Sequence, residues 1–253
     1  MRKVIYTCIV DGYDELRQPE VVDDSYDYVC FTNDVSEDII GVWKIRPIPF
    51  ACNDSTRLSR YVKILPHLVL EDYDVSVWMD ANIVVKGRAF YDAVESKVDS
   101  GCLMAQVPHI GRDCVYDEIA RCYKNLKIGF QEASKQRRHL KDEGFPRHFG
   151  MMENNLIFRR HNDPLVIRLS EGWWKEYMAY SRRDQLALMP VLWKQGFMPD
   201  LLLGEGANAR TADCLDVIHH PSVVKAARIK GVRRIPLKIR WTWRGAVASI
   251  FLR

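Results

Sequence analysis

The segment Trp78-Met79-Asp80-Ala81-Asn82 places a carboxylate and a carboxamide two positions apart at the end of an apolar run. Alternate side chains of an extended segment point to the same side, so Asp80 and Asn82 can offer two oxygen ligands to one cation. Mg²⁺ and Mn²⁺ take oxygen ligands and often bridge to substrate phosphates. The alternative is a turn that ends a strand, and for the tripeptide alone the turn is the commoner case.

Three cations precede this segment at spacings of three residues: Arg57, Arg60 and Lys63. Side chains at this spacing lie near one face of a helix. They could neutralise a diphosphate, or they could form an ordinary solvated face. No acidic residue occurs between positions 55 and 70, which makes an ordinary solvated face less usual.

Polar residues also flank apolar runs later in the chain. Glu153, Asn154 and Asn155 come before one such run, and they could bind sugar hydroxyls or form a loop. His219 and His220 follow another run. One of these histidines could complete the ligands of a metal ion, although a histidine pair after a strand is more often structural.

A further carboxylate, Asp184, lies three residues after Ser181. This spacing is typical of a capping box, in which Ser181 would begin a helix and Asp184 would have a structural role. The functional alternative is a carboxylate near a helix start that is aimed at a reacting centre.

Apolar runs and helical periodicity predict the elements that must position these residues. We expect strands at 4–10, 26–32, 42–46, 75–79, 101–106 and 155–159, and helices at 54–70, 113–142, 164–178 and 183–195. Pro66 interrupts the first helix. Strands that alternate with helices indicate an α/β sheet with mainly parallel pairing, which binds ligands beyond the carboxyl ends of its strands. Polar residues stand at those ends: Asp11, Asn33, Asp34, Asp80 and Asn82.

Composition limits the class of protein. The chain has 253 residues, of which 47% are hydrophobic, enough for one sizeable core or one domain with an appendage. With 28% charged residues and a net charge of +4, it is neither a disordered chain nor strongly basic. We find no secretory signal and no apolar run long enough to span a membrane. The seven cysteines form no C-x-x-C pair, so we expect reduced thiols in a cytosol and no zinc site built from cysteines.

The carboxyl-terminal residues 225–253 hold nine cations and no acid, with Trp241 and Trp243 among them. This combination is typical of a helix that lies on an anionic membrane surface. The alternatives are a basic helix packed on the domain, a disordered tail, or a segment that binds single-stranded nucleic acid. We expect the membrane surface and no nucleic acid.

Several motifs in order resemble a bacterial and plant glycosyltransferase-like family whose plant members include a galacturonosyltransferase of seed mucilage. These motifs are Y-T-C-I-V-D-G-Y-D, F-T-N-D, R-L-S-R-Y-V-K-I-L-P-H, W-M-D-A-N, E-N-N-L-I-F-R, S-R-R-D-Q-L-A-L and I-H-H-P. The resemblance runs from about residue 3 to about residue 221. It implies a GT-A-like, Rossmann-like nucleotide-sugar-binding domain at 1–221, with a mainly parallel mixed sheet flanked by helices. The basic tail would occupy 222–253.

The resemblance also implies roles for single residues. Asp80 and Asn82 would stand at the metal-binding D-x-D motif and hold Mn²⁺ or Mg²⁺, with His219 or His220 as a third ligand. The neutral Asn82 would make this metal site weaker than one with two carboxylates. The donor would be bound by Asp11, Tyr13, Asn33, Asp34, Arg57, Arg60, Lys63, Asn154, Asn155 and Gln185. Asp184 or Glu153 would be the general base of an inverting reaction; in a retaining reaction Asp184 would only position the sugar.

The implied activity is transfer of a hexose from a nucleoside-diphosphate sugar, with a UDP-sugar favoured, to a hydroxyl of a polysaccharide or lipid-linked glycan. The setting would be capsule or O-antigen synthesis by a cytoplasmic protein at the inner face of a bacterial membrane. One alternative is a nucleotidyltransferase, for which Asp11-Gly12 is a poor phosphate loop. Another is a non-catalytic carbohydrate-binding or scaffold protein, to which Asn82 lends some weight.

Overall fold

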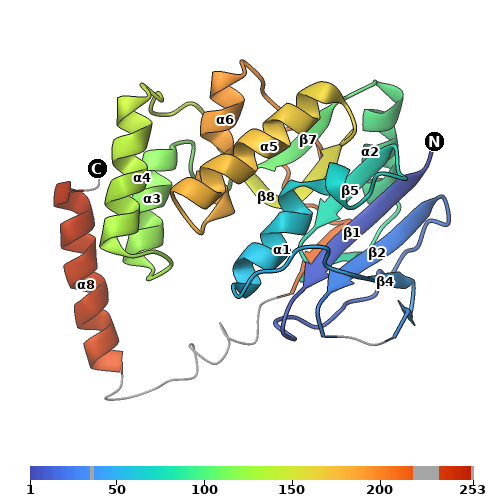
Figure 1. Cartoon of the computed structure of the whole chain (residues 1–253), viewed down its shortest axis with the longest axis horizontal. Coiled ribbons are helices and arrows are strands. Elements are labelled where there is room, and N and C mark those ends of the chain that lie inside the picture. Colours follow the sequence, from blue (N-terminus) through green and yellow to red (C-terminus); the bar gives the residue numbers. More distant parts are fainter. Residues whose placement is uncertain (35–36, 219–233, 252–253) are drawn as a thin grey trace. The chain divides into compact units, whose positions relative to one another are not determined.

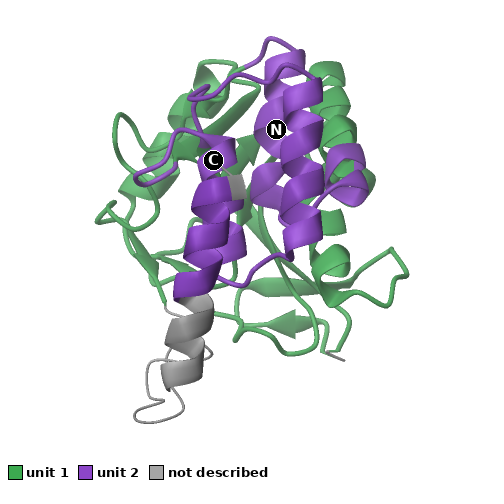
Figure 2. Cartoon of the chain, turned by 90° about the vertical axis from the view of Figure 1, so that its left-hand side faces the viewer, with its two compact units in different colours: residues 1–108, 152–174, 198–218 green, residues 109–151, 175–197, 219–253 purple. Residues whose placement is uncertain are grey.

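A computed structural model describes residues 1–34, 37–218 and 234–251 of the chain, with only the backbone at 234–241 and 251. The predicted ligands His219 and His220 and the basic residues at 225–233 therefore lie outside the described residues. The chain forms two compact units, coloured separately in Figure 2. Unit 1 holds residues 1–108, 152–174 and 198–218, and unit 2 holds residues 109–151, 175–197 and 219–253.

Unit 1 is built on an eight-stranded sheet with the order β3-β4-β2-β1-β5-β8-β7-β9 (Figure 1). Its strands are β1 (Lys3–Ile9), β2 (Tyr26–Thr32), β3 (Ile39–Ile40), β4 (Trp43–Pro47), β5 (Val75–Met79), β7 (Met104–Pro108), β8 (Met152–Arg159) and β9 (Asp200–Leu201). The β4-β2-β1-β5 block is parallel, whereas β8 runs antiparallel to both β5 and β7. The predicted fold class, a mainly parallel mixed sheet with flanking helices, is confirmed.

The central strands are mostly apolar and buried, as is typical of a sheet that is covered on both faces. All five residues of β5 are buried, and so are Val4, Ile5 and Tyr6 of β1. A second, two-stranded sheet pairs β6 (Ile83–Val85) with β10 (Leu215–Val217) in antiparallel register. Strand β5 of the large sheet ends at Met79, and β6 of the small sheet begins at Ile83. The segment Asp80-Ala81-Asn82 therefore connects the two sheets.

Helix α1 (Ser55–Ile64) packs against β1 and ends earlier than the periodicity predicts. The side chain of Asp54 caps its start by accepting from the backbone N–H groups of Thr56 and Arg57, at 3.0 and 3.3 Å. Pro66 cannot continue the helix, and it begins the short 3₁₀ helix η1 (Pro66–Leu68). The other helices that begin in unit 1 are α2 (Ala89–Asp99), which the sequence did not predict, and α5 (Pro164–Ala179).

Unit 2 is helical and contains α3 (Val115–Lys124), α4 (Phe130–Asp142), η2 (Asp184–Leu186), α6 (Leu188–Lys194) and α8 (Arg234–Phe251). The single helix predicted at 113–142 is divided because Leu126 takes a left-handed conformation, with φ at 62°. Helix α8 packs on α3, where Arg244 donates to the carbonyls of Tyr123 and Ile128 at 2.7 and 2.8 Å. No helix within the described residues has the length and apolar character needed to cross a membrane.

Two local predictions are corrected. Of the two alternatives for Glu153, Asn154 and Asn155, the loop is wrong, because β8 already begins at Met152 and pairs with β7 from that residue onward. No helix begins at Ser181, so the capping box is wrong: its hydroxyl accepts from Arg183 N–H at 3.1 Å, and Asp184 instead opens the short turn η2.

Candidate functional site

Asp80 follows β5 directly and is held from two sides. Its backbone N–H donates to the carbonyl of Asn155 on β8, at 2.9 Å. Its carboxylate oxygen Oδ1 accepts from Trp78 Nε1 at 2.8 Å and from Lys63 Nζ at 3.2 Å. Because both contacts fall on Oδ1, a cation at this carboxylate would be bound through Oδ2.

Lys63 lies inside unit 1, in contrast to the two arginines before it on α1. Only 2% of its surface is exposed, and its Nζ lies 5.2 Å from the centre of the Trp78 ring. Its carbonyl accepts from Tyr6 Oη at 3.3 Å and from Arg159 Nη2 at 2.6 Å. The last turn of α1 is therefore anchored to β1 and β8, and the Lys63 ammonium group points at Asp80.

Asn82 is joined to the strand that leads to the two histidines. Its Nδ2 donates to the carbonyl of Ile218 at 3.0 Å, and the Ile218 N–H donates back to the Asn82 carbonyl at 2.8 Å. Val217 pairs with Ile83 in the same antiparallel ladder. The described chain before His219 thus ends beside Asn82, although their sequence positions are far apart.

The polar residues of β8 form a second group next to Asp80. Glu153 Oε2 accepts from Arg210 Nη1 at 2.5 Å and from Asn155 Nδ2 at 2.9 Å, and Glu153 is buried. The buried Gln106 of β7 donates to Asn154 Oδ1 at 3.0 Å. These bonds fix the orientation of the Glu153 carboxylate and of the Asn154 amide.

A third group joins the carboxyl ends of β1 and β2. Asp11 and Asn33 exchange two hydrogen bonds, at 3.0 and 2.9 Å, and the Ser55 hydroxyl donates to Asp11 as well. These hydrogen bonds lower the pKa of Asp11, and the bond from Ser55 contributes more than the bond from Asn33. Asp34 accepts from Thr32 Oγ1 at 2.5 Å. Asp11 and Asn33, two of the predicted nucleoside-binding residues, therefore meet at the carboxyl ends of β1 and β2.

The remaining predicted residues are placed as follows. Tyr13, after β1, is 70% exposed. Arg57 lies 3.8 Å from Asp54, and Arg60 Nη1 donates to Ser59 Oγ at 3.1 Å. Asp184 is buried and Gln185 half-buried, and both belong to unit 2, whereas all the residues above belong to unit 1.

The donors in unit 1 fit a divalent cation. A carboxylate and an amide carbonyl, with an imidazole nearby in the sequence, are ligands that Mn²⁺ and Mg²⁺ accept. The Asn155 backbone carbonyl contacts the Asp80 N–H, and the buried Asn155 Oδ1 accepts no hydrogen bond from any described residue, so it can accept one from a ligand. Lys63 already supplies one positive charge at Asp80, which lowers the affinity for a cation there.

A groove of about 440 Å³ lies in unit 1, near the carboxyl ends of β2 and β4. Its lining consists of Phe31, Arg46, Pro47, Pro49, Leu68, Val69, Glu71 and Asp72, and includes none of the predicted site residues.

Residues 1–200 match the TOD1/MUCI70 glycosyltransferase-like domain, which covers most of the chain. The chain belongs to this family. The expected family resemblance is thereby confirmed, and the chain carries a glycosyltransferase-like domain. No curated protein matches the sequence.

Solved structures that resemble this member of the TOD1/MUCI70 family include three glycosyltransferases. Mouse xyloside xylosyltransferase 1, in its apo form, has 9% identity over 79% of this chain and 84% of that chain, with a TM-score of 0.45. Apo WbbM, a bifunctional glycosyltransferase, has 13% identity over 96% of this chain but only 44% of its own, with a TM-score of 0.46. The galactosyltransferase LgtC, with donor and acceptor sugar analogs, has 12% identity over 75% and 70% of the two chains and a TM-score of 0.41. Similarity this distant gives no residue-by-residue correspondence.

Three residues that contact the predicted site residues were missed in the sequence: Tyr6, Arg159 and Arg210. Arg210 binds Glu153 from 57 positions away. Tyr6 and Arg159 hold the Lys63 carbonyl. The only local signal was the loop 204–211, where Gly204 and Gly206 have positive φ and Asn208 caps the Arg210 N–H at 2.7 Å.

Proposed function

We propose that this protein is a metal-dependent glycosyltransferase that moves a hexose from a nucleoside-diphosphate sugar, with a UDP-sugar favoured, to a hydroxyl of a polysaccharide or lipid-linked glycan. The observation that carries the proposal is the gathering of polar side chains around Asp80. Asn155 is hydrogen-bonded to it through the backbone, Lys63 through its side chain, and Asn82 follows two residues later. Family membership supplies the reaction class.

The residues that would hold Mn²⁺ or Mg²⁺ are Asp80, through its carboxylate, and Asn82, through its amide oxygen, with His219 or His220 as a third ligand. The hydrogen bonds between Asn82 and Ile218 support the third ligand, since Ile218 directly precedes the histidine pair. When bound, such an ion stabilises negative charge on the departing diphosphate.

The protein's own cations have two different tasks in this proposal. Arg57 and Arg60, half-buried on α1, bind the diphosphate through charge-assisted hydrogen bonds. Lys63, buried and paired with Asp80, orients the carboxylate and keeps positive charge beside the leaving group. Asp11 and Asn33 are held together at the edge of the sheet and contact the nucleoside.

Two carboxylates are candidates for the base that accepts the acceptor hydroxyl proton. Glu153 is held in unit 1 by Arg210 and Asn155, which fixes its direction. Asp184 is a buried carboxylate of unit 2. Glu153→Gln and Asp184→Asn separate the two: the base variant loses kcat with little change in donor KM, while a positioning residue changes KM as well.

The basic carboxyl-terminal segment supports a location at an anionic membrane surface, which we propose to be the cytoplasmic face of the inner membrane. In this proposal the lipid-linked or growing glycan acceptor is presented at that surface. This part of the proposal depends on the sequence of 225–253 and is independent of the donor site.

The decisive experiment measures the thermal stability of the full chain with UDP, GDP and their common sugar conjugates, each with and without Mn²⁺. We expect one nucleotide family to raise Tm only when Mn²⁺ is present, because ligands that bind the folded state stabilise it. Release of free sugar from the same conjugate then tests for turnover. Stabilisation without turnover would favour a carbohydrate-binding protein, and no stabilisation by any nucleotide would overturn the proposal.

A further inference from the structure

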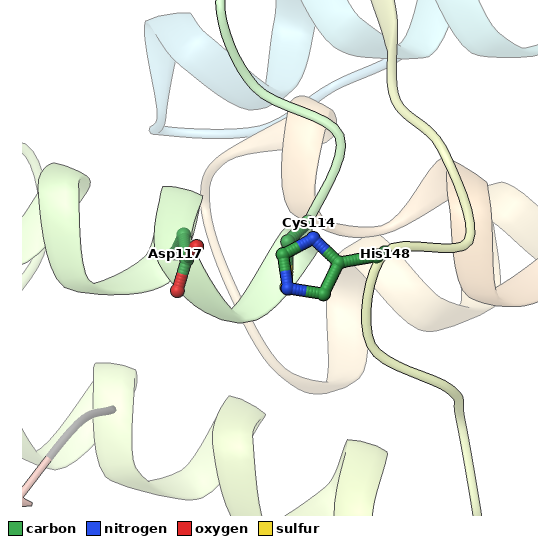
Figure 3. A group of neighbouring side chains, drawn as sticks. All are labelled: Cys114, Asp117 and His148. Atoms are coloured by element: carbon green, nitrogen blue, oxygen red, sulfur yellow. The ribbon is translucent and has the colours of Figure 1, made fainter.

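We propose that unit 2 carries a separate site for a transition-metal ion, with Zn²⁺ as the best-fitting one, formed by Cys114, Asp117 and His148. One ligand atom from each of these residues lies within 4.8 Å of the others. Figure 3 shows the imidazole ring of His148 over Cys114, with the Asp117 carboxylate beside them on α3. The site shares no residue with the donor site proposed above.

Helix α3 supplies two of the ligands from its first turn. Cys114 is the N-cap residue of α3, and its side chain makes no capping hydrogen bond, so the thiol is not used by the helix. Asp117 lies three positions later, a spacing that brings two side chains to the same side of a helix. Cys114 is 1% exposed and Asp117 is half-exposed, so the site is buried at Cys114 and open to solvent at Asp117.

The third ligand is held in place by the backbone around it. His148 has a left-handed conformation with φ at 55°, which is costly for a residue with a Cβ. Its Nδ1 lies 2.9 Å from Asp113 Oδ1, and the N–H of Gly150 donates to the Asp113 carbonyl at 2.9 Å. The segment 148–150 is thus fixed against the residue that precedes Cys114.

The contact with Asp113 also decides which ring nitrogen can bind a metal. A carboxylate that accepts from one nitrogen fixes the tautomer and leaves the other nitrogen as a ligand, an arrangement typical of histidines bound to zinc. Since Nδ1 of His148 faces Asp113, Nε2 is the ligand atom.

The three ligand types select the metal. A thiolate, an imidazole and a carboxylate suit Zn²⁺ and related ions, whereas Mg²⁺ and Ca²⁺ prefer oxygen alone. Tetrahedral zinc ligands stand about 3.3–3.6 Å apart, given bonds of about 2.0–2.3 Å. Ligand atoms at the 4.8 Å limit need to approach one another by about 1.2–1.5 Å, which rotation of the half-exposed Asp117 side chain can supply. Arg147 Nη1, 3.8 Å from Asp117 Oδ1, is a weak and exposed competitor.

A metal at this site would join the start of α3 to the segment that follows α4. Three protein ligands leave a fourth position for water, on the side where His148 and Asp117 are exposed to solvent. We therefore expect the ion to stabilise unit 2, since any ligand of the folded state raises its stability by mass action.

The test is a Co²⁺ titration of the full chain after removal of metal by a chelator. A cobalt–thiolate bond gives near-ultraviolet charge-transfer absorption, which we expect at one Co²⁺ per chain and which Zn²⁺ should abolish. Cys114→Ser should lose the absorption. Asp113→Asn should keep it but weaken affinity by about 10–100-fold, because it removes the partner of the ligating histidine. Zn²⁺ should raise the Tm of the natural protein and not of Cys114→Ser.

Two controls make the outcome specific. Cys122→Ala changes the other cysteine of α3 and should leave the absorption intact, and so should Asp80→Asn, which alters only the donor site. If Cys114→Ser does not fold, Asp117→Asn and His148→Ala test the site instead, because these side chains are partly exposed to solvent. Each variant should lower the Co²⁺ affinity at least tenfold. The proposed site would be overturned if the natural protein showed no cobalt–thiolate absorption. It would also be overturned if Cys114→Ser kept that absorption.

Discussion

Asp80 has two tasks that a pair of substitutions can separate. It accepts hydrogen bonds from Trp78 and Lys63, and in our proposal it binds the cation. Both variants remove the negative charge beside the buried Lys63 ammonium, but Asp80→Asn keeps an oxygen that can accept from both donors. We expect both variants to lose Mn²⁺-dependent binding of a nucleoside diphosphate, measured by calorimetry. Asp80→Ala should also lower the free energy of unfolding by about 1–3 kcal/mol, and Asp80→Asn should lower it by less.

A matched control is Asp92→Ala, which removes an exposed carboxylate on α2 whose side chain is 66% exposed. It should change neither property. Unchanged nucleotide affinity in Asp80→Asn would remove Asp80 from the binding site.

Arg60 tests the phosphate-binding face of α1. A charge-assisted contact to phosphate contributes about 1.5–3 kcal/mol, so Arg60→Ala should weaken binding of a nucleoside diphosphate more than tenfold. Binding of the nucleoside alone should stay nearly the same. Calorimetry with both ligands measures the difference, and equal losses for the two would show that Arg60 acts through the fold.

His161 makes stability depend on pH. It is fully buried, its Nε2 lies 2.9 Å from the Leu70 carbonyl, and burial lowers its pKa to about 4. In the unfolded chain the imidazole protonates near pH 6.5, so between about pH 6.5 and pH 4 the unfolded state binds more protons. Stability should be complete above this window and fall as the pH drops through it, by about 2 kcal/mol at pH 5.

The variant His161→Gln keeps a donor for the Leu70 carbonyl but does not titrate. Urea unfolding at pH 7 and pH 5 should show a smaller loss at pH 5 in this variant than in the natural protein. The same loss in both would mean that other groups, such as His67 with its burial-lowered pKa, control the acid response.

Among the helices, α1 matters most for the proposed donor site, because it carries Arg57, Arg60 and Lys63. Its start depends on the Asp54 cap, whose carboxylate accepts two backbone N–H groups. Asp54→Ala should lower the free energy of unfolding by about 1 kcal/mol, and Asp54→Asn should retain most of it, since Asn is an equally good N-cap. Urea unfolding distinguishes the two. An equal loss in both variants would assign the effect to the negative charge and not to the cap.

The chain as a whole joins a glycosyltransferase-like domain to a basic carboxyl-terminal helix, and its attachment to membranes is open to test. On α8, Trp243 and Ile250 are 65% and 71% exposed and lie seven residues, about two turns, apart on one side. Arg244, between them, instead binds carbonyls of α3 and its following loop. We expect the natural protein to sediment with anionic vesicles and to be partly released by high salt, which screens its cations.

The double variant Trp243→Ala, Ile250→Ala should bind such vesicles less well at both salt concentrations and keep its Tm, because both side chains face solvent. Arg244→Gln should instead lower Tm and affect binding only through the fold. If the double variant bound vesicles as well as the natural protein does, α8 would not be the attachment surface.

The amino-acid sequence by itself determined the central strands and the polar residues that end them. The predicted β5 and β2 agree with the structure residue for residue, and Asp11 and Asn33 meet where the sheet topology requires. These features depend on the spacing of apolar residues and on the residue types that favour turns. Both are properties of a few neighbouring residues, so a single sequence shows them.

Only the tertiary structure decided which distant groups meet. The Lys63–Asp80 pair, the Arg210–Glu153 pair and the position of His148 beside Cys114 depend on strand order, register and one left-handed residue. The sequence left a loop open as one alternative for the polar start of β8, because its pairing with β7, and not its composition, makes it a strand. Contacts between residues tens of positions apart are set by how the elements pack, and no local pattern in the sequence encodes that packing.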